Sequence, residues 1–428
     1  MSTESLITVD EAAALLGVSP ATVRRRCGNG DIAAERVGRS WLIDSSALPR
    51  AGPSPTRRRR VSGAASSLVD LNRSLQHLRS QDLQRDLWVP DILRYEDDLL
   101  NTDSLLEAAA AKLDLNERFE PPVNIPVPKS PFFLRNAMNL ALSDRLAYHA
   151  AVEAISGSLA AAAGPCAYSA RLAKSDKYFL EFGSQAWVRW KTAVQAKTAE
   201  LNGFVVETDV TAFFDCISHT VLMQELQDLA LPKPLLDALR EMLRTWESAP
   251  NTGIPQGPDA SRLLGNFYMA PIDAVITVIP DVRYFRYMDD IRIVSPSRHS
   301  AIEALKLLDT ECRKRNLSLS TKKTELRHGK EAFDALEDPK INAAKYAFDA
   351  GGDPRAVRRQ MGALFRASLR PDGTIDARRA KFSIYRLRAL RESSVRTLVL
   401  RNLESLAGLG WLVPCVSPAL DETSSGEP

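Results

Sequence analysis

Two adjacent carboxylates, Asp289 and Asp290, lie at the turn between two short strand-like segments, 283–287 and 291–295. Both segments are rich in aromatic and β-branched residues, and Asp is a favoured turn residue. Two carboxylates at a hairpin tip repel each other, so the pair is costly unless a cation offsets the charge. Taken alone, the pair is typical of a solvated surface turn.

A third carboxylate ends a buried-strand pattern upstream. Residues 203–209 read Gly-Phe-Val-Val-Glu-Thr-Asp, which puts Asp209 at a strand end. A strand end beside a hairpin tip gathers the hard oxygen ligands that Mg²⁺ prefers, and this ion usually keeps substrate phosphates and waters in its shell. Two such ions can activate a 3′-hydroxyl and stabilise a leaving pyrophosphate. The pattern therefore predicts nucleotidyl transfer.

Two further segments strengthen this interpretation when they are taken together. Residues 253–261 form a Gly/Pro-rich loop before an apolar helix, and Gln256 in this loop can donate and accept at a base or sugar edge. Residues 317–320 read as a strand that runs into Lys322-Lys323. Alone, the first segment is equally well an ordinary strand-to-helix turn, and the second is typical of a solvated face.

In this order, the four segments resemble the palm motifs of the reverse transcriptase family. The residues that carry the resemblance are Asp209 with Phe213-Phe214, Pro255-Gln256-Gly257 with Ser261, Tyr287-Met288-Asp289-Asp290, and Lys323-Thr324. The resemblance covers roughly residues 126–326. Trp187, the run 205–209 and Gly257-Pro258 before Ser261 look more like the bacterial abortive-infection and defence-associated enzymes than like retroviral or group II intron enzymes.

The resemblance implies roles for individual residues. Asp209 and Asp289 would hold two Mg²⁺ ions with help from the Val210 carbonyl, Asp290 would support the site, and Lys323 would act near the departing pyrophosphate. The incoming nucleotide and the nascent base pair would be contacted by Phe214, Gln256, Gly257, Lys129, Arg135 and Arg171. For the last three residues, a surface charge is an equally good interpretation.

The N-terminal residues 1–48 form a self-contained pattern. Thr8 and Glu11 make a capping box for one helix, and Ser19-Pro20 starts a second, basic helix. A small hairpin with Gly38-Arg39 at its tip follows. This order resembles the winged helix-turn-helix domains of the excisionase and MerR type. The residues expected to contact duplex DNA are Arg24, Arg25, Arg26, Arg36 and Arg39. The alternative is a solvated basic helix in a small packing module.

The remaining pattern predicts an α+β protein with the right-hand polymerase architecture. Residues 49–67 read as a flexible basic linker, 68–330 as fingers and palm with a β-hairpin active site, 331–416 as a basic helical thumb, and 417–428 as a disordered tail. Five scattered cysteines, no signal-peptide pattern and no apolar run of membrane-spanning length favour a cytoplasmic protein without a membrane partner. The net charge of +3 is modest.

These observations predict an RNA-directed DNA polymerase with an RNA template and a DNA product, and the finer resemblance implies a role in bacterial antiviral defence. A non-coding RNA partner is compatible with it. The alternatives are a mobile-element or retron enzyme, a template-independent DNA polymerase and, in a different class, a catalytically silent DNA-binding regulator. Three retained carboxylates argue against the last alternative, and the oligomeric state stays open.

Overall fold

The computed structural model describes most of the chain outside the predicted linker and tail. The described residues are 6–16, 20–28, 32–37, 40–44, 64–85, 91–130, 133–336, 341, 344, 354–370, 374–390, 394–402 and 406. The Arg57–Arg60 run, Arg39, Cys415 and residues 417–428 lie outside these ranges, as do the side chains of Arg25, Lys129 and Arg135.

The N-terminal unit is a pair of helices packed on a three-stranded antiparallel sheet of order β1-β3-β2. Its elements are β1 (Leu6–Ile7), α1 (Val9–Leu16), α2 (Pro20–Gly28), β2 (Ala34–Val37) and β3 (Ser40–Asp44). The capping box forms as expected: the Thr8 amide donates to the Glu11 carboxylate at 2.7 Å, and the Glu11 amide donates to the Thr8 hydroxyl at 3.3 Å. A small apolar core that includes Val23 and Ile43 holds the unit together.

Short helices and one β-hairpin connect this unit to the central sheet. They are η2 (Ala65–Leu68), α3 (Leu71–His77), the π-helix η3 (Leu78–Asp82), α4 (Leu83–Arg85), α5 (Tyr95–Asp98), α6 (Thr102–Leu113), β4 (Val123–Ser130), β5 (Phe133–Asn139), α7 (Leu142–Ala154), α8 (Ser156–Ala162) and α9 (Gly183–Leu201). The segment after Leu68 is helical, and Leu75 and Leu78 are buried, whereas Leu68 is exposed. The β4 strand, which contains Pro126 and Pro128, is extended and pairs with β5.

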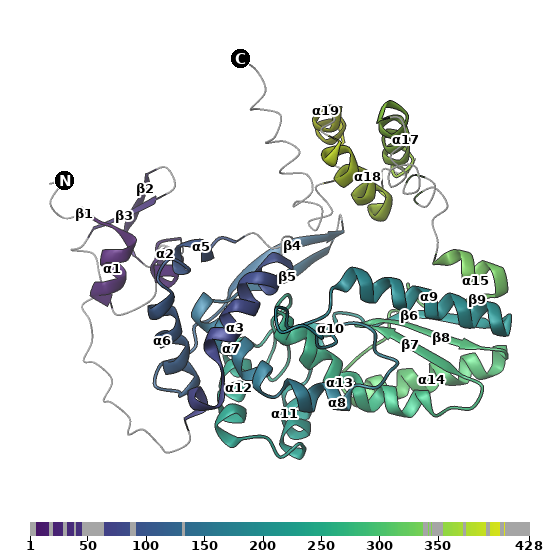
Figure 1. The fold of residues 1–428 in the computed structure, drawn as a ribbon, viewed down its shortest axis with the longest axis horizontal. Helices are drawn as coiled ribbons and strands as arrows, with labels where there is room; N and C mark the ends of the chain where they lie inside the picture. The colour runs from purple at the N-terminus through teal and green to yellow at the C-terminus, as the bar shows by residue number, and fades with distance from the viewer. Residues whose placement is uncertain are drawn as a thin grey trace.

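The central sheet has the order β7-β8-β6-β9, and all its neighbouring strands are antiparallel. Its elements in chain order are β6 (Phe204–Asp209), α10 (Phe213–Cys216), α11 (His219–Asp228), α12 (Lys233–Thr245), α13 (Asp259–Thr277), β7 (Arg283–Tyr287), β8 (Asp290–Ser295), α14 (Arg298–Lys314) and β9 (Glu325–His328). This βαββαβ order is the ferredoxin-like arrangement. The α9 helix and α15 (Gly329–Ala335) lie on one side of the sheet, and α13 and α14 lie on the other (Figure 1).

The alternation of side chains along β6 explains the two apolar layers. Val206 packs into the main core with Ile291 and Ile293, whereas Val205 packs with Trp190 of α9 on the opposite face. Ser218 and Ser297 cap α11 and α14 by accepting amide hydrogens, as serines before a helix commonly do. The sheet is therefore anchored on both faces.

One element differs from expectation. Residues 317–320 form no regular strand: Leu319 makes an isolated bridge with Val210, and the fourth strand, β9, begins only after the lysines. The reason is that two backbone bonds, from the Thr211 amide to Ser318 and from the Ser320 amide to Asp209, are followed at once by a turn. The lysine pair therefore lies in a turn at the end of β6.

The C-terminal helices α17 (Pro354–Arg366), α18 (Ala377–Ala389) and α19 (Ser394–Arg401) have an apolar core of their own, which includes Met361, Phe365 and Ile384. Figure 1 shows them apart from the central sheet, above α15. The predicted helical character of this region is thus observed. No helix among the described residues combines the length and the apolar character needed to cross a membrane.

Candidate active site

Asp209 and Asp290 are direct cross-strand partners where β6 and β8 meet. The Val210 amide donates to the Asp289 carbonyl at 3.1 Å, so the pairing continues by one residue beyond the regular strands. Because side chains of directly opposed residues share a face, the Asp209 and Asp290 carboxylates emerge on the same side of the sheet. The fold thus joins the strand end and the hairpin that the sequence predicted separately.

The hairpin tip is a two-residue turn, Met288-Asp289, between paired Tyr287 and Asp290. Met288 has a left-handed backbone with φ of 58°, which is strained for a residue other than Gly. Two contacts compensate: the Met288 amide donates to the Ser169 hydroxyl at 2.7 Å, and its carbonyl accepts from Arg286 at 3.0 Å. The surroundings therefore dictate the turn that carries Asp289.

Arg286 is a fully buried residue that sequence reasoning did not identify. Its guanidinium pairs with Asp273 of α13 at 2.6 Å and donates to the Asn266 side-chain oxygen at 2.9 Å. It thereby ties the catalytic hairpin to the helix that follows the Gln256 loop. The sequence does indicate this buried pair, because Arg286 lies in the middle of an aromatic strand, where a charge is costly unless it is paired.

Burial and the neighbouring charges act together on the Asp290 carboxyl. Burial raises the pKa of Asp290 to about 6; Asp289 and Asp209 add to the rise, while Arg292 and Lys323 oppose it. The Lys323 ammonium is bound to Asp209 and is mostly exposed. Glu207, two residues earlier on the same face, is paired with both Arg292 and Arg327. The charges of Asp209 and Asp289 therefore disfavour ionisation of Asp290, as expected where acidic groups converge.

The three carboxylates are close in the sheet but do not form a compact ligand set. In the described part of the chain, one group of three or more potential ligands has its atoms within 4.8 Å of one another, and it lies elsewhere. Like charges repel, which keeps the aspartates apart, and the amine of Lys323 serves as the cation at Asp209. The donor set itself, Asp209 and Asp290 on one face with Asp289 in the adjoining turn, is of the carboxylate type that hard divalent ions prefer.

The Gln256 loop is held against the first motif. The Ile254 amide donates to the Phe214 carbonyl at 3.0 Å, and the Gly253 amide donates to Ile217 at 2.9 Å. Gln256 is half-buried, and Gly257 has φ of 128°, a conformation that favours glycine. The loop ends at α13, whose first amide, of Asp259, donates to Asp82. The loop is therefore placed beside Phe214 by backbone contacts.

The two phenylalanines after Asp209 differ in burial. Phe213 is 3% exposed and lies in the main core, whereas Phe214 is half-buried. Their ring centroids are 5.2 Å apart. A Cβ at Gly265 would lie 2.9 Å from the Phe213 ring and 3.5 Å from the Phe214 ring, so the backbone of α13 approaches this pair closely. This leaves Phe214 as the ring with an accessible edge.

Of the three basic residues expected in the fingers, Arg171 is the one whose side chain the structure describes. Lys129 and Arg135 lie on the β4–β5 hairpin, which precedes α7. Arg171 donates to the carbonyls of Ala167 and Pro165 at 2.6 and 2.8 Å, which is a structural role in this arrangement. Substrate contact by these three residues stays a prediction.

In the N-terminal unit the basic residues divide into two groups. Arg24 is 9% exposed and is bound to Asp97 at 2.9 Å and to the Leu93 carbonyl at 3.0 Å, so its guanidinium faces protein rather than solvent. Arg36 is exposed and Arg26 is partly exposed. The expectation that Arg24 contacts DNA is therefore wrong for this arrangement, because its charge is already neutralised by Asp97.

Comparison with known proteins agrees with this geometry. Residues 164–346 match the family model described as reverse transcriptase (RNA-dependent DNA polymerase), and residues 6–50 match that of a helix-turn-helix domain. No curated protein matches the chain. Reverse transcriptase domains use divalent metal ions, in keeping with the carboxylate set.

Two telomerase structures are among the similar solved structures. One is telomerase from Candida albicans in complex with a fragment of telomeric RNA, with 11% identity, a TM-score of 0.30, and coverage of 57% of this chain and 51% of that one. The other is telomerase from Candida tropicalis without its C-terminal domain, with 11% identity, a TM-score of 0.34, and coverage of 49% and 50%. The chain spans about half the length of each.

Proposed function

We propose that this chain, which carries a reverse transcriptase domain behind an N-terminal helix-turn-helix domain, synthesises DNA on an RNA template by two-metal nucleotidyl transfer. One observation carries the proposal: Asp209 lies directly opposite Asp290 across β6 and β8, with Asp289 at the adjoining hairpin tip. Sequence-distant carboxylates on one face are what a phosphoryl-transfer site requires.

The proposed role of each carboxylate and of Lys323 follows from its position in the site. Asp209 and Asp289, with the Val210 carbonyl, would hold two Mg²⁺ ions, which when bound activate the primer 3′-hydroxyl and stabilise the leaving pyrophosphate. Asp290 would keep the local charge negative beneath them. Lys323 neutralises Asp209 in the free protein, and its long exposed side chain can exchange that carboxylate for a substrate phosphate.

The nucleotide would lie between the two loops that the backbone contacts join. Phe214 would pack under the sugar, and Gln256 with the open backbone of Gly257 would meet the nascent base pair. Lys129, Arg135 and Arg171 are the candidates for triphosphate contact from the fingers. Duplex DNA would bind the N-terminal domain through Arg26 and Arg36, with Arg25 and Arg39 as further candidates.

The test is direct. Purified protein is given Mg²⁺, the four dNTPs and a DNA primer on an RNA template, and extension is followed together with sequencing of the product and of co-purified nucleic acid. Templated extension supports the proposal. Untemplated products would favour a template-independent polymerase, and no incorporation on any substrate, with the fold intact, would favour a silent DNA-binding regulator.

The biological role that we propose is antiviral defence in bacteria, which rests on the resemblance at Trp187, residues 205–209 and Gly257-Pro258. A mobile-element or retron enzyme would use the same chemistry. Expression of the wild-type chain and of Asp289→Asn in a phage-sensitive host separates the roles: protection that requires Asp289 supports defence, and transfer of a marked element without protection supports the alternative.

A further inference from the structure

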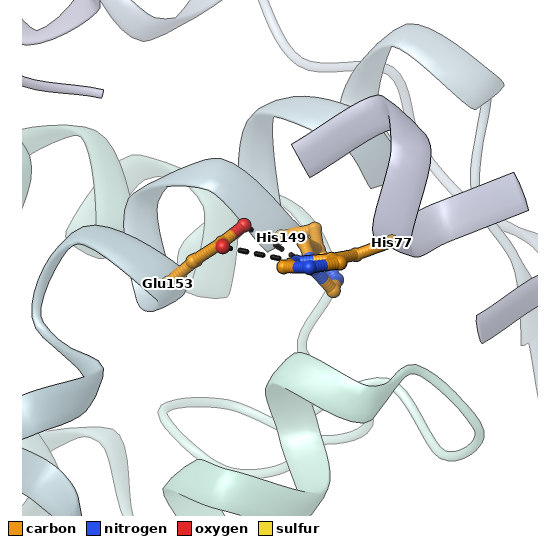
Figure 2. Close-up of side chains that lie close together, drawn as sticks. All are labelled: His77, His149 and Glu153. Atoms are coloured by element: carbon orange, nitrogen blue, oxygen red, sulfur yellow. Dashed lines mark ion pairs between the residues drawn. The ribbon is translucent and has the colours of Figure 1, made fainter. Parts of the chain in front are cut away.

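A buried cluster of potential ligands lies between α3 and α7, outside the polymerase site. His77 ends α3, and His149 and Glu153 are one helical turn apart on α7, so all three side chains point into the same space (Figure 2). One atom from each lies within 4.8 Å of the others. Both imidazoles are buried, and Glu153 is nearly so.

The hydrogen bond of His77 defines which ring nitrogen carries the proton. Nε2 lies 2.8 Å from the Asp176 carbonyl, which can only accept, so Nε2 carries a proton. In the neutral ring, Nδ1 then presents a lone pair 3.0 Å from Glu153 Oε1. Neither atom has a hydrogen-bond partner of acceptable geometry. Two acceptors this close repel each other unless a cation lies between them.

His149 lacks hydrogen-bond partners at both ring nitrogens, whereas His77 lacks one only at Nδ1. Both of the His149 nitrogens are buried, and Nε2 lies 3.6 Å from Glu153 Oε2. Leaving such buried polar groups unsatisfied destabilises the fold. Asp82 is nearby, but its oxygens accept from Arg145 and from the Asp259 amide.

We propose that His77 Nδ1, His149 Nε2 and the Glu153 carboxylate form a structural site for a divalent transition-metal ion, with Zn²⁺ as the preferred ion. Two imidazoles and a carboxylate suit Zn²⁺, whereas Mg²⁺ prefers oxygen ligands. Ligands at Zn²⁺ bond lengths in a tetrahedron are about 3.4 Å apart. His77 Nδ1 lies 3.0 Å from Glu153 Oε1 and His149 Nε2 lies 3.6 Å from Glu153 Oε2, so each imidazole faces a different carboxylate oxygen, at separations on either side of that value. A fourth position remains for water.

The surroundings resemble the outer shell of a metal site. The Asp176 carbonyl orients His77, and the Ser74 hydroxyl donates to Glu153 Oε2 at 2.7 Å. Arg73 also approaches Glu153, with Nε 3.1 Å from Oε1, but this side chain is 53% exposed and can move to solvent when an ion binds. The outer contacts therefore hold the ligands in place without filling the centre.

The ion would cross-link three segments that support the polymerase site. It would hold α3 and the loop at Asp176 against α7. The α7 helix also places the Tyr148 hydroxyl 3.0 Å from Ser261 Oγ, near the start of α13. Neighbouring Arg145 binds Asp82, which accepts from the Asp259 amide. The ion would stabilise the base of the fingers and take no part in the nucleotidyl transfer.

The experiment uses full-length protein without a histidine tag. Metal content is measured by elemental mass spectrometry, and we expect about one zinc per chain. Removal of the ion with a chelator should lower the thermal midpoint by roughly 5 °C, and Zn²⁺ alone should restore it. Replacement by Co²⁺ should give the visible absorption of a tetrahedral ion. Mg²⁺ should give neither signal.

Variants locate the site. His149→Ala and the size-preserving Glu153→Gln should each lose the bound zinc, and the second should do so while it stays folded. His299→Ala removes an exposed histidine, and Asp289→Asn alters the polymerase site, so both should keep the zinc. The proposal is overturned if wild type neither contains nor responds to Zn²⁺, since His77 is then a charged partner of Glu153. Unchanged zinc content in a His77→Ala/His149→Ala double variant overturns it equally.

Discussion

Arg286 and Asp273 form a buried ion pair, with Nη2 2.6 Å from Oδ2, that joins the strand before the catalytic turn to α13. The same guanidinium donates to the Met288 carbonyl at 3.0 Å, so one side chain holds both the helix and the strained turn that carries Asp289. The position of Asp289, the proposed metal ligand, therefore depends on a contact that lies outside the palm motifs.

Arg286→Met should destabilise the protein strongly, because Asp273 is left buried without its partner. The expected loss in unfolding free energy is about 3–5 kcal/mol. The double variant Arg286→Met/Asp273→Leu removes both charges and should recover most of that loss, while nucleotide incorporation stays roughly 10²-fold down because the turn is no longer held. Denaturant unfolding and single-turnover rates check this. Full activity in the double variant would show that the turn needs no such support.

Asp289→Asn should abolish nucleotide incorporation while it preserves the fold, since the change removes a metal-binding charge and some like-charge repulsion. Incorporation from a primed RNA template and the thermal midpoint are measured together. Asp281→Asn, an exposed change in the nearby turn before β7, is the matched control and should behave as wild type. Undiminished incorporation by Asp289→Asn would remove Asp289 from the site.

Phe214→Val should raise the use of ribonucleotides relative to deoxyribonucleotides, because a smaller side chain leaves room for a 2′-hydroxyl. Phe213→Val should instead cost about 2–4 kcal/mol of stability, since that ring fills the core against Gly265. The readout is the ratio of kcat/KM for one dNTP and its matching rNTP in both variants. If the ratio is unchanged in Phe214→Val, this ring is not the sugar gate.

Duplex DNA binding by the full chain should weaken with salt, and Arg26→Ala or Arg36→Ala should each reduce the slope of log K against log salt by about 1. Arg24→Ala should leave that slope unchanged and lower stability, because its guanidinium is bound to Asp97 and Leu93. Gel retardation across a salt series distinguishes the cases. Absence of retardation at low salt would indicate a protein-interaction module.

Asp98 should make the protein less stable as pH rises. Burial raises its pKa to about 6, with Asp97 and Asp91 adding to the rise and Arg24 opposing it, and its Oδ1 has no hydrogen-bond partner. Below about pH 4 the carboxyl is protonated in both folded and unfolded states. Between about pH 4 and 6 only the folded state keeps the proton, so stability falls across this window by on the order of 2–3 kcal/mol and stays low above it.

Asp98→Asn should therefore raise the unfolding midpoint at pH 7.5 and change it little at pH 4. The exposed Asp228→Asn is the control and should shift neither value. Thermal unfolding of the three proteins in matched buffers measures the effect. An equal shift at both pH values would mean that a change in packing, rather than ionisation, causes it.

The sequence by itself determined the features that depend on local pattern. Alternation predicts the strand that ends at Asp209, and turn residues predict the hairpin around Asp289. Side-chain contacts a few positions apart explain the capping box at Thr8 and Glu11 and the helix cap at Ser218. Such features can be predicted from a short segment of sequence, because the interacting groups are close along the chain. They were enough to predict the α+β palm and its chemistry.

Only the tertiary structure decided which distant groups meet. Four pairs join residues from separate elements. Asp209 lies opposite Asp290, Arg286 is buried against Asp273, Arg24 is neutralised by Asp97, and His77 converges with His149. A charged or imidazole side chain has the same local pattern whether it is solvated, paired or a ligand. What distinguishes these states is burial and the partner across the fold, and these are properties of the packed chain rather than of any one segment.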